Sequence, residues 1–279
     1  LSTTLTLYRQ DLLGQARADP PTNFEALGQA ARALRARTGT YAWFPAMDGS
    51  APLETMVAMS GPLITSNGCR PAFDTAQGVA AFTWHRDLFQ QRCIPPAVLT
   101  EGHRGAVTQY MAGQLAMVST GMQFMSHLAN GSPTLYERTG VSPQVTSAMS
   151  RPNIAAMNLA VLSTCQEPDL AFRLAQWVTD SPRQLELVKR VPLLPSTRGS
   201  YEDPLFSGRT GTGLLDQARA LSVRQVMEGE VQVPPLRRYH KLRTTFVRSL
   251  QAAMTGRSSP QQAIGDAARS WLALLGCRA

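Results

Sequence analysis

Side chains that commonly do chemistry are few and scattered in this chain. The four histidines stand alone, without the spacing of metal ligands, at His85, His103, His127 and His240. No glycine-rich nucleotide loop, HExxH zinc motif or GxSxG nucleophile motif occurs. Asp48 and Glu54 are close in sequence but lack the signature of an acid/base pair. The sequence therefore predicts no catalytic residue, no metal site and no cofactor.

The cysteines give no metal motif either, because no CxxC pair and no Cys/His cluster is present among Cys69, Cys93, Cys165 and Cys277. In an exported protein one disulfide would be compatible with this number. Cys69 and Cys93 flank an expected helix of about 16 residues, which is about 24 Å long. A disulfide needs Cα atoms within about 7 Å. We therefore expect these two cysteines to be free or to pair elsewhere.

Charge and hydropathy argue against two classes of protein, nucleic-acid-binding and membrane-spanning ones. The net charge is +8 and the pI is about 9.9, but charged residues make up only 16% of the chain. The densest basic segment, residues 237–243, holds only a handful of charges, so a solvated basic face is favoured over nucleic-acid binding. No apolar run reaches the roughly 18 residues of a membrane-spanning helix, so no transmembrane segment is expected.

The periodicity of apolar residues predicts strands that alternate with helices. Residues 3–9 alternate like a strand, and Thr22 with Glu25 resembles a capping box at the start of a helix that ends near Gly39. Further short strands are expected at 41–44, 115–119 and 155–162. Further helices are expected at 52–59, after Asp74, at 103–112, 122–128, 169–179 and 182–190, and from 214 to the C-terminus, with a final helix opened by Ser259 and Pro260. This alternation indicates an α/β protein with short, interrupted sheets.

Several blocks, taken in order, resemble bacterial extracellular solute-binding proteins. Residues 20–27, PPTNFEAL, are similar to the family's Pro-Pro-Thr-Thr-Trp-x-Glu-Leu, and residues 110–117, YMAGQLAM, are similar to its Phe-x-x-Gly-Lys-x-Ala-Met. Residues 119–121, STG, resemble its glycerol-phosphate and sugar-binding branches. Two departures are Phe24 in place of Trp, and alanines at 155 and 156 where paired glycines are common.

The resemblance implies an α/β fold of the type II periplasmic-binding-protein kind, with two lobes joined by a hinge. Because the interlobe crossover of the family matches the first residues here, the first lobe is expected to be incomplete in this chain. The expected division is 1–152 for the crossover and the first part of the second lobe, 153–198 for a remnant of the first lobe, and 199–279 for second-lobe helices. Residues 155–162 are then expected to lack sheet neighbours.

The family places its ligand contacts on loops at strand ends, where aromatic rings stack on sugars and polar groups meet hydroxyls. Carried onto this chain, three groups of residues are implied as ligand-binding: Trp43, Phe44 and Asp48; Ser119, Thr120, Met122 and Gln123; and Tyr239, His240 and Arg243. Each has a plainer alternative, because the aromatic residues could belong to the core, Asp48 to a turn and Arg243 to a solvated helix face.

The implied function is that of a substrate-binding component of an ABC importer that captures a sugar or sugar-like polyol. Such a protein is no enzyme, works in the periplasm or outside the cell, delivers its carbohydrate ligand to permease subunits and is a monomer when complete. A glycerophosphate or sugar-phosphate binder of the same fold remains the nearest alternative. A carbohydrate-processing hydrolase is the alternative from another class, and a scaffold or nucleic-acid-binding module is the third.

Overall fold

The computed structural model describes residues 1–206 and 211–276, and its core is a small antiparallel sheet. The central strand β2 (Leu5–Arg9) pairs with β3 (Met117–Thr120) on one side and with β4 (Thr139–Pro143) on the other. Consecutive residues of β2 are buried at no more than 1% exposure: Leu5, Thr6 and Leu7. Because successive side chains point to opposite faces of a sheet, both faces of β2 are covered.

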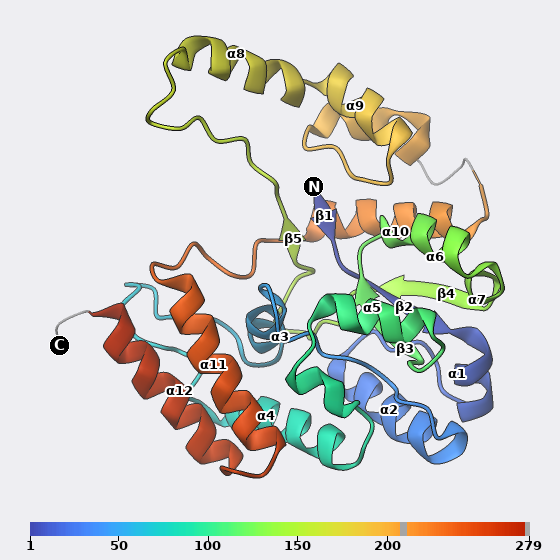
Figure 1. Ribbon diagram of the computed structural model, residues 1–279, viewed down its shortest axis with the longest axis vertical. Helices are drawn as coiled ribbons and strands as arrows, with labels where there is room; N and C mark the ends of the chain where they lie inside the picture. The colour runs from blue at the N-terminus through green and yellow to red at the C-terminus, as the bar shows by residue number, and fades with distance from the viewer. Residues whose placement is uncertain (207–210, 277–279) are drawn as a thin grey trace.

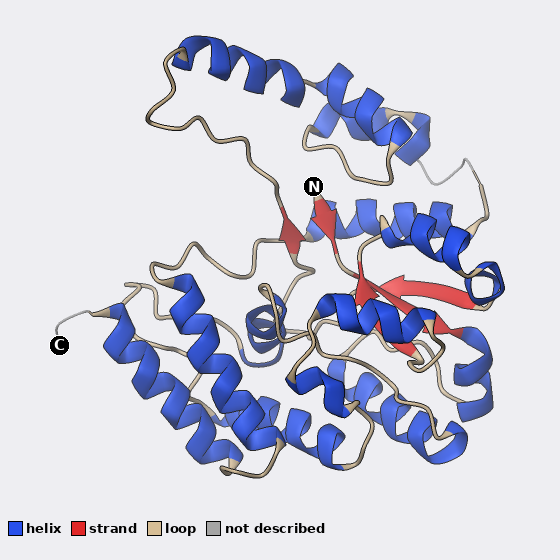
Figure 2. Ribbon diagram, viewed as in Figure 1, coloured by secondary structure: helices blue, strands red, loops and turns tan. Residues whose placement is uncertain are grey.

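Helices surround this sheet and outnumber the strands (Figure 2). Helix α10 (Leu214–Glu228) packs against β4 and β1, α1 (Gln10–Ala16) packs against β2 and α2 (Phe24–Thr38), and α5 (His103–Met111) packs against β3. In Figure 1, α10 lies above the sheet, and α1 and α2 lie below it. Short elements complete this part: α6 (Phe124–Gly131), α7 (Pro133–Glu137) and the 3-10 helix η1 (Pro96–Leu99). Two further 3-10 helices follow later in the chain, η2 (Arg198–Glu202), which packs against α9 (Ser181–Arg190), and η3 (Pro204–Phe206), which contacts η2 and α10.

A second group of helices consists of α3 (Ala51–Ser60), α4 (Ala76–Gln90), α11 (Tyr239–Met254) and α12 (Pro260–Leu275). Its centre is aromatic: Phe73 packs edge-on against both Phe246 and Trp271, with ring centroids 5.5 and 4.9 Å apart. The Trp271 ring is fully buried, and its Nε1–H donates to the Leu242 carbonyl at 2.9 Å. The expected start of α12 is confirmed, since Ser259 is its N-cap and Pro260 its first residue.

A two-stranded ribbon precedes the segment that leads to the next pair of helices. Strand β1 (Ser2–Thr3) pairs antiparallel with β5 (Ile154–Ala155). After β5 an extended segment leads to α8 (Pro168–Thr179) and α9 (Ser181–Arg190), which lie apart from the rest of the molecule in Figure 1. This part exposes large apolar side chains, at fractions from 54% to 84%, on Met157, Leu159, Leu162, Leu170, Phe172, Leu174 and Trp177.

The structure corrects several local predictions. The N-cap of α2 is Asn23, whose side-chain oxygen accepts from the Ala26 N–H at 2.8 Å, so the capping box predicted at Thr22 is wrong. Of the strand expected at 155–162, only Ala155 is in a strand. It pairs with Ser2, so the expectation that this segment lacks sheet neighbours is wrong for Ala155. Of the strand expected at 41–44, only an isolated bridge from Tyr41 to Leu115 forms.

The expectation about the cysteines is confirmed. Cys69 is disulfide-bonded, whereas Cys93 and Cys165 are free, so Cys69 and Cys93 do not pair. Cys93 is buried, and that burial raises the pKa of its thiol. The prediction of an α/β chain with short sheets is confirmed, but strands and helices do not alternate regularly, because runs of helices separate the few strands.

Candidate ligand-binding site

A cavity of about 350 Å³ lies between the sheet, the start of α3 and the β1–β5 ribbon. Its walls come from segments far apart in the sequence, which the crossing of β2 between β3 and β4 brings together. Six of the ten predicted site residues line it: Trp43, Phe44, Asp48, Ser119, Thr120 and Gln123. Other lining residues include Thr3, Phe24, Ser50, Glu54, His103, Gln144 and Asn153.

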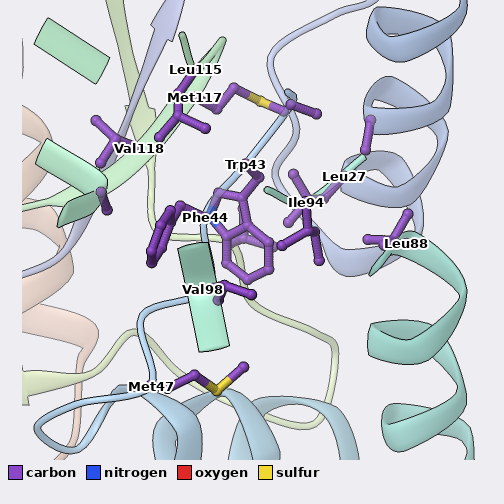
Figure 3. Close-up of a cluster of buried hydrophobic side chains, with 14 of the residues drawn as sticks. Leu27, Trp43, Phe44, Met47, Leu88, Ile94, Val98, Leu115, Met117 and Val118 are labelled. Carbon is purple, nitrogen blue, oxygen red and sulfur yellow. The ribbon is translucent and has the colours of Figure 1, made fainter. Parts of the chain in front are cut away.

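One wall of the cavity is aromatic and belongs to the core as well. Trp43 and Phe44 are only 6% and 2% exposed, and Figure 3 shows both rings among buried aliphatic side chains. The Trp43 Nε1–H donates to Ser119 Oγ at 3.1 Å, and its ring packs edge-on against Trp84 at 5.8 Å. Trp43 therefore belongs to the core, as the plainer interpretation holds, and also lines the cavity.

Asp48 lies on a loop whose position is fixed by a helix end. Its Oδ1 accepts a hydrogen bond from the His103 backbone N–H, the first residue of α5, at 2.9 Å. A carboxylate at a helix N-terminus satisfies a free N–H group and complements the positive end of the helix dipole. Gly102 permits this approach, since a Cβ there would lie 2.2 Å from Asp48 Oδ2. Asp48 thus caps α5 while its exposed carboxylate borders the cavity.

The turn after β3 supplies hydroxyl and amide groups. Thr120 is buried at 4% exposure, whereas the Gln123 side chain is exposed and folds over Gly121. A side chain at Gly121 would collide with Gln123, because its Cβ would lie 2.1 Å from Gln123 Oε1. Met122 does not line the cavity but is buried at 4% exposure beside it.

The third predicted group lies behind the Asp48 loop. The Tyr239 hydroxyl donates to the Gly49 carbonyl at 2.9 Å, and Arg243 Nη1 donates to the same oxygen at 3.2 Å. Burial raises the pKa of Tyr239. His240 is exposed and packs edge-on against Tyr239 at 5.7 Å. None of these three side chains lines the cavity, so in this structure they support the loop.

Sequence reasoning missed Glu54, on the first turns of α3. Burial raises the pKa of its carboxyl group, while hydrogen bonds from the Ser50 and Asn153 side chains oppose that shift. A signal was present, because Ala51, Thr55 and Ala58 share its helix face and form a small or polar strip that lines the cavity. Asn153 was not predicted as a site residue either, although it lines the cavity and directly precedes β5 of the ribbon.

Asn153 belongs to a chain of hydrogen bonds that ties three crossing segments together. Its backbone carbonyl accepts from Thr3 Oγ1 at 3.0 Å, and its N–H donates to Gln144 Oε1 at 2.8 Å. Its Oδ1 accepts from the Gln232 N–H at 3.1 Å. Thr3, Gln144 and Asn153 also line the cavity. A ligand in the cavity would therefore meet the groups that hold the crossing segments together.

Among residues 1–206 and 211–276, no three His, Cys, Asp or Glu side chains are grouped to hold a metal ion. Within the same residues, no helix combines the length and the apolar character needed to cross a bilayer.

The chain is similar to known proteins in both sequence and structure. The family model described as bacterial extracellular solute-binding protein matches residues 1–209. No curated protein sequence matches the chain. A solved structure proposed to be an oligosaccharide periplasmic-binding protein from Synechococcus sp. MITs9220 is 28% identical with a TM-score of 0.92, over 98% of this chain and 71% of that chain.

More distant structures share the fold. The GacH receptor of Streptomyces glaucescens GLA.O, solved without ligand and with acarbose, has a TM-score of 0.82 at 19% identity, over 98% of this chain and 69% of that one. Maltose-bound MalE3 of T. maritima has a TM-score of 0.75 at 20% identity, over 98% and 71%. These matches confirm the predicted α/β fold of the type II periplasmic-binding-protein kind.

Proposed function

Because this chain belongs to the bacterial extracellular solute-binding proteins, we propose that it is the substrate-binding component of an ABC importer and captures a sugar or sugar-like polyol in the cavity. The observation that carries the proposal is the combination of an aromatic wall, Trp43 and Phe44, with Asp48 and Ser119 in one cavity. Aromatic faces pack on the C–H faces of a sugar ring, while carboxylate, amide and hydroxyl groups bind its hydroxyls.

The cavity volume fits a small ligand. About 350 Å³ lies at the lower end of the range for small-molecule sites, roughly 300–1,000 Å³. The similar Synechococcus protein is proposed to bind oligosaccharides, and the structures with acarbose and maltose hold carbohydrate ligands. These names support a carbohydrate for this chain without identifying which one.

The wider role follows from the same proposal. The protein acts in the periplasm or outside the cell, and permease subunits receive its ligand. Residues 1–152 and 199–279 form the second lobe with the crossover, and residues 153–198 form part of the first lobe. The separate position of α8 and α9 in Figure 1 and their exposed apolar side chains support this division. Closure of two lobes over a ligand is a hinge motion.

One observation favours a different class of function. Asp48 and Glu54 both line the cavity, and a pair of carboxyl groups around one sugar is the arrangement that glycosidases use. Against hydrolysis, Asp48 is engaged at the N-terminus of α5 and Glu54 by Ser50 and Asn153. A test of binding must therefore also follow the ligand for cleavage.

The proposal is tested with the 279-residue chain and a panel of glucose, galactose, maltose, maltotriose and longer malto-oligosaccharides. Thermal unfolding and calorimetry measure binding, and chromatography of the recovered sugar measures turnover. We expect at least one sugar to bind and to be recovered intact. A shortened sugar would establish the hydrolase instead. If no carbohydrate on the panel binds, the sugar-binding proposal fails.

A further inference from the structure

We propose that Glu54 is a specificity-determining residue: together with Asp48 it selects carbohydrates without an anionic group and favours those with a protonated amine. The inference rests on the proposed function and names the ligand class of the same cavity. The part of the cavity concerned is the one formed by α3. There a ligand would meet the Glu54 carboxyl group beside Ser50 and Asn153.

The ionisable side chains in the cavity wall are unbalanced in charge. Among the described residues that line it, Asp48 and Glu54 are acidic and no lysine or arginine is present. His103, the histidine of this wall, is exposed. The whole chain carries a net charge of +8, so the acidic lining is a local feature rather than a consequence of composition. The net positive charge of the whole chain attracts anions at long range, whereas the acidic side chains that line the cavity repel them.

Arg243, which supports the Asp48 loop, is engaged outside the cavity. Arg243 donates to the Gly49 carbonyl from behind the loop and does not line the cavity. Tyr239 occupies the same carbonyl oxygen at 2.9 Å. A phosphate or carboxylate in the cavity would thus lose its hydration without gaining a cationic partner, which is the costly way to bury a charge.

The Glu54 carboxyl group suits hydroxyl or ammonium donors. A carboxylate can accept about four hydrogen bonds, and the side chains of Ser50 and Asn153 use two of them, so acceptor capacity remains for a ligand. Burial already raises the pKa of Glu54, because the charged form is less well solvated there. An anion beside it would either face this charge or force the carboxyl group to take up a proton. Both routes weaken the binding of anions.

The experiment compares matched ligands by calorimetry at pH 7 with the 279-residue chain: glucose, glucosamine and glucose 6-phosphate, and the galactose series with the same substituents. We expect each phosphate to bind at least about 30-fold more weakly than its parent sugar, as two like charges in a partly buried site imply. We expect the amine to bind at least as tightly as the parent. Malto-oligosaccharides serve as the separate test of carbohydrate binding.

The variant Glu54→Gln keeps the shape and removes the charge. It should reduce the discrimination against phosphate at least about 10-fold and abolish the preference for the amine, because a charged partner contributes roughly twice as much as a neutral one. Glu137→Gln, which removes an exposed carboxylate outside the cavity, should leave both ratios unchanged. Should Glu54→Gln not fold, Asp48→Asn tests the other carboxylate of the cavity lining in the same way.

The outcomes separate the two proposals. Equal or tighter binding of the phosphates by the unmodified chain would overturn the charge selection while carbohydrate binding stands. Unchanged ratios in a folded Glu54→Gln variant would overturn the role of Glu54. Failure of every carbohydrate, malto-oligosaccharides included, would remove the proposed function and this inference with it.

Discussion

The Gln225 side chain donates to Thr3 Oγ1 at 3.0 Å, although the two residues are 222 positions apart in the sequence. The same amide donates to the Thr4 carbonyl at 2.9 Å, and its oxygen accepts from the Gln144 N–H at 2.6 Å. A helix near the C-terminal end of the chain, α10, therefore fixes both the first strand and the segment that follows β4. Gln225 is only 4% exposed, so water does not replace these bonds easily.

This relationship predicts a large effect of a conservative substitution. Gln225→Met keeps the approximate volume but leaves the Gln144 N–H and the Thr4 carbonyl unpaired, which should lower the free energy of unfolding by about 2–4 kcal/mol. Urea denaturation followed by circular dichroism measures it. Gln217→Met in the same helix removes an exposed glutamine and should change stability by less than about 0.5 kcal/mol. Equal effects of the two substitutions would show that the buried network adds no stability.

A second prediction concerns a buried histidine on α4. His85 is 5% exposed, and its Nδ1 lies 2.8 Å from the Ala81 carbonyl, so Nδ1 carries the proton of the neutral ring. Burial lowers the pKa of His85 from 6.5 to about 4. As the pH falls below 6.5, the unfolded chain binds a proton that the folded chain does not, so stability is lost between pH 6.5 and about 4.

The loss attributable to His85 should be about 2 kcal/mol between pH 7 and pH 5. His85→Leu removes this titration while other groups still titrate, so the free energy of unfolding of the variant should fall less over the same range. Urea denaturation at both pH values measures the difference. Parallel pH dependence in the two proteins would mean that the folded protein protonates His85 as readily as the unfolded chain.

Much of the fold was predictable because its elements are locally consistent. The block 110–117 was recognised from its residue types, and it ends α5 and begins β3 as expected. Strand β4 was missed, because its sequence Thr-Gly-Val-Ser-Pro is typical of a turn and only pairing with β2 makes it a strand. The cap of α2 was misplaced by one residue because Thr22 and Asn23 are both good N-caps, and local propensity does not separate them.

The candidate site was predictable in part, from the loop residue Asp48 and from Ser119 near the end of β3. Asp48 and Ser119 line the cavity, in accordance with the resemblance. Tyr239 and Arg243 were expected to contact ligand, but their partner is the Gly49 carbonyl, a backbone atom that no residue type reveals. Glu54 was missed because a glutamate on a helix is usually solvated, and only the tertiary arrangement turns its face toward the cavity.

Substitutions at Asp48 should separate its two roles. Asp48→Asn retains an oxygen for the His103 N–H, whereas Asp48→Ala removes the cap of α5 and should lower stability by about 1 kcal/mol. Both should weaken sugar binding, since both remove the carboxylate from the rim. Thermal unfolding and calorimetry provide the two measurements. The control Asp74→Ala removes an exposed carboxylate before α4 and should affect neither. Unchanged affinity in Asp48→Asn would exclude a contact of the charge with ligand.

The last prediction concerns the support of the Asp48 loop by Tyr239. Tyr239→Phe removes the hydrogen bond to Gly49 but keeps the ring, so the affinity for sugar should fall by about 3–10-fold, the equivalent of one lost hydrogen bond. Because the hydroxyl faces the loop and not the cavity, the ranking of different sugars should not change. His240→Ala removes an exposed ring next to Tyr239 and should leave the affinity unchanged. Calorimetry with the sugars that bind the unmodified chain measures affinity and ranking together. A changed ranking in Tyr239→Phe would instead place the phenol in contact with the ligand, where the resemblance had placed it.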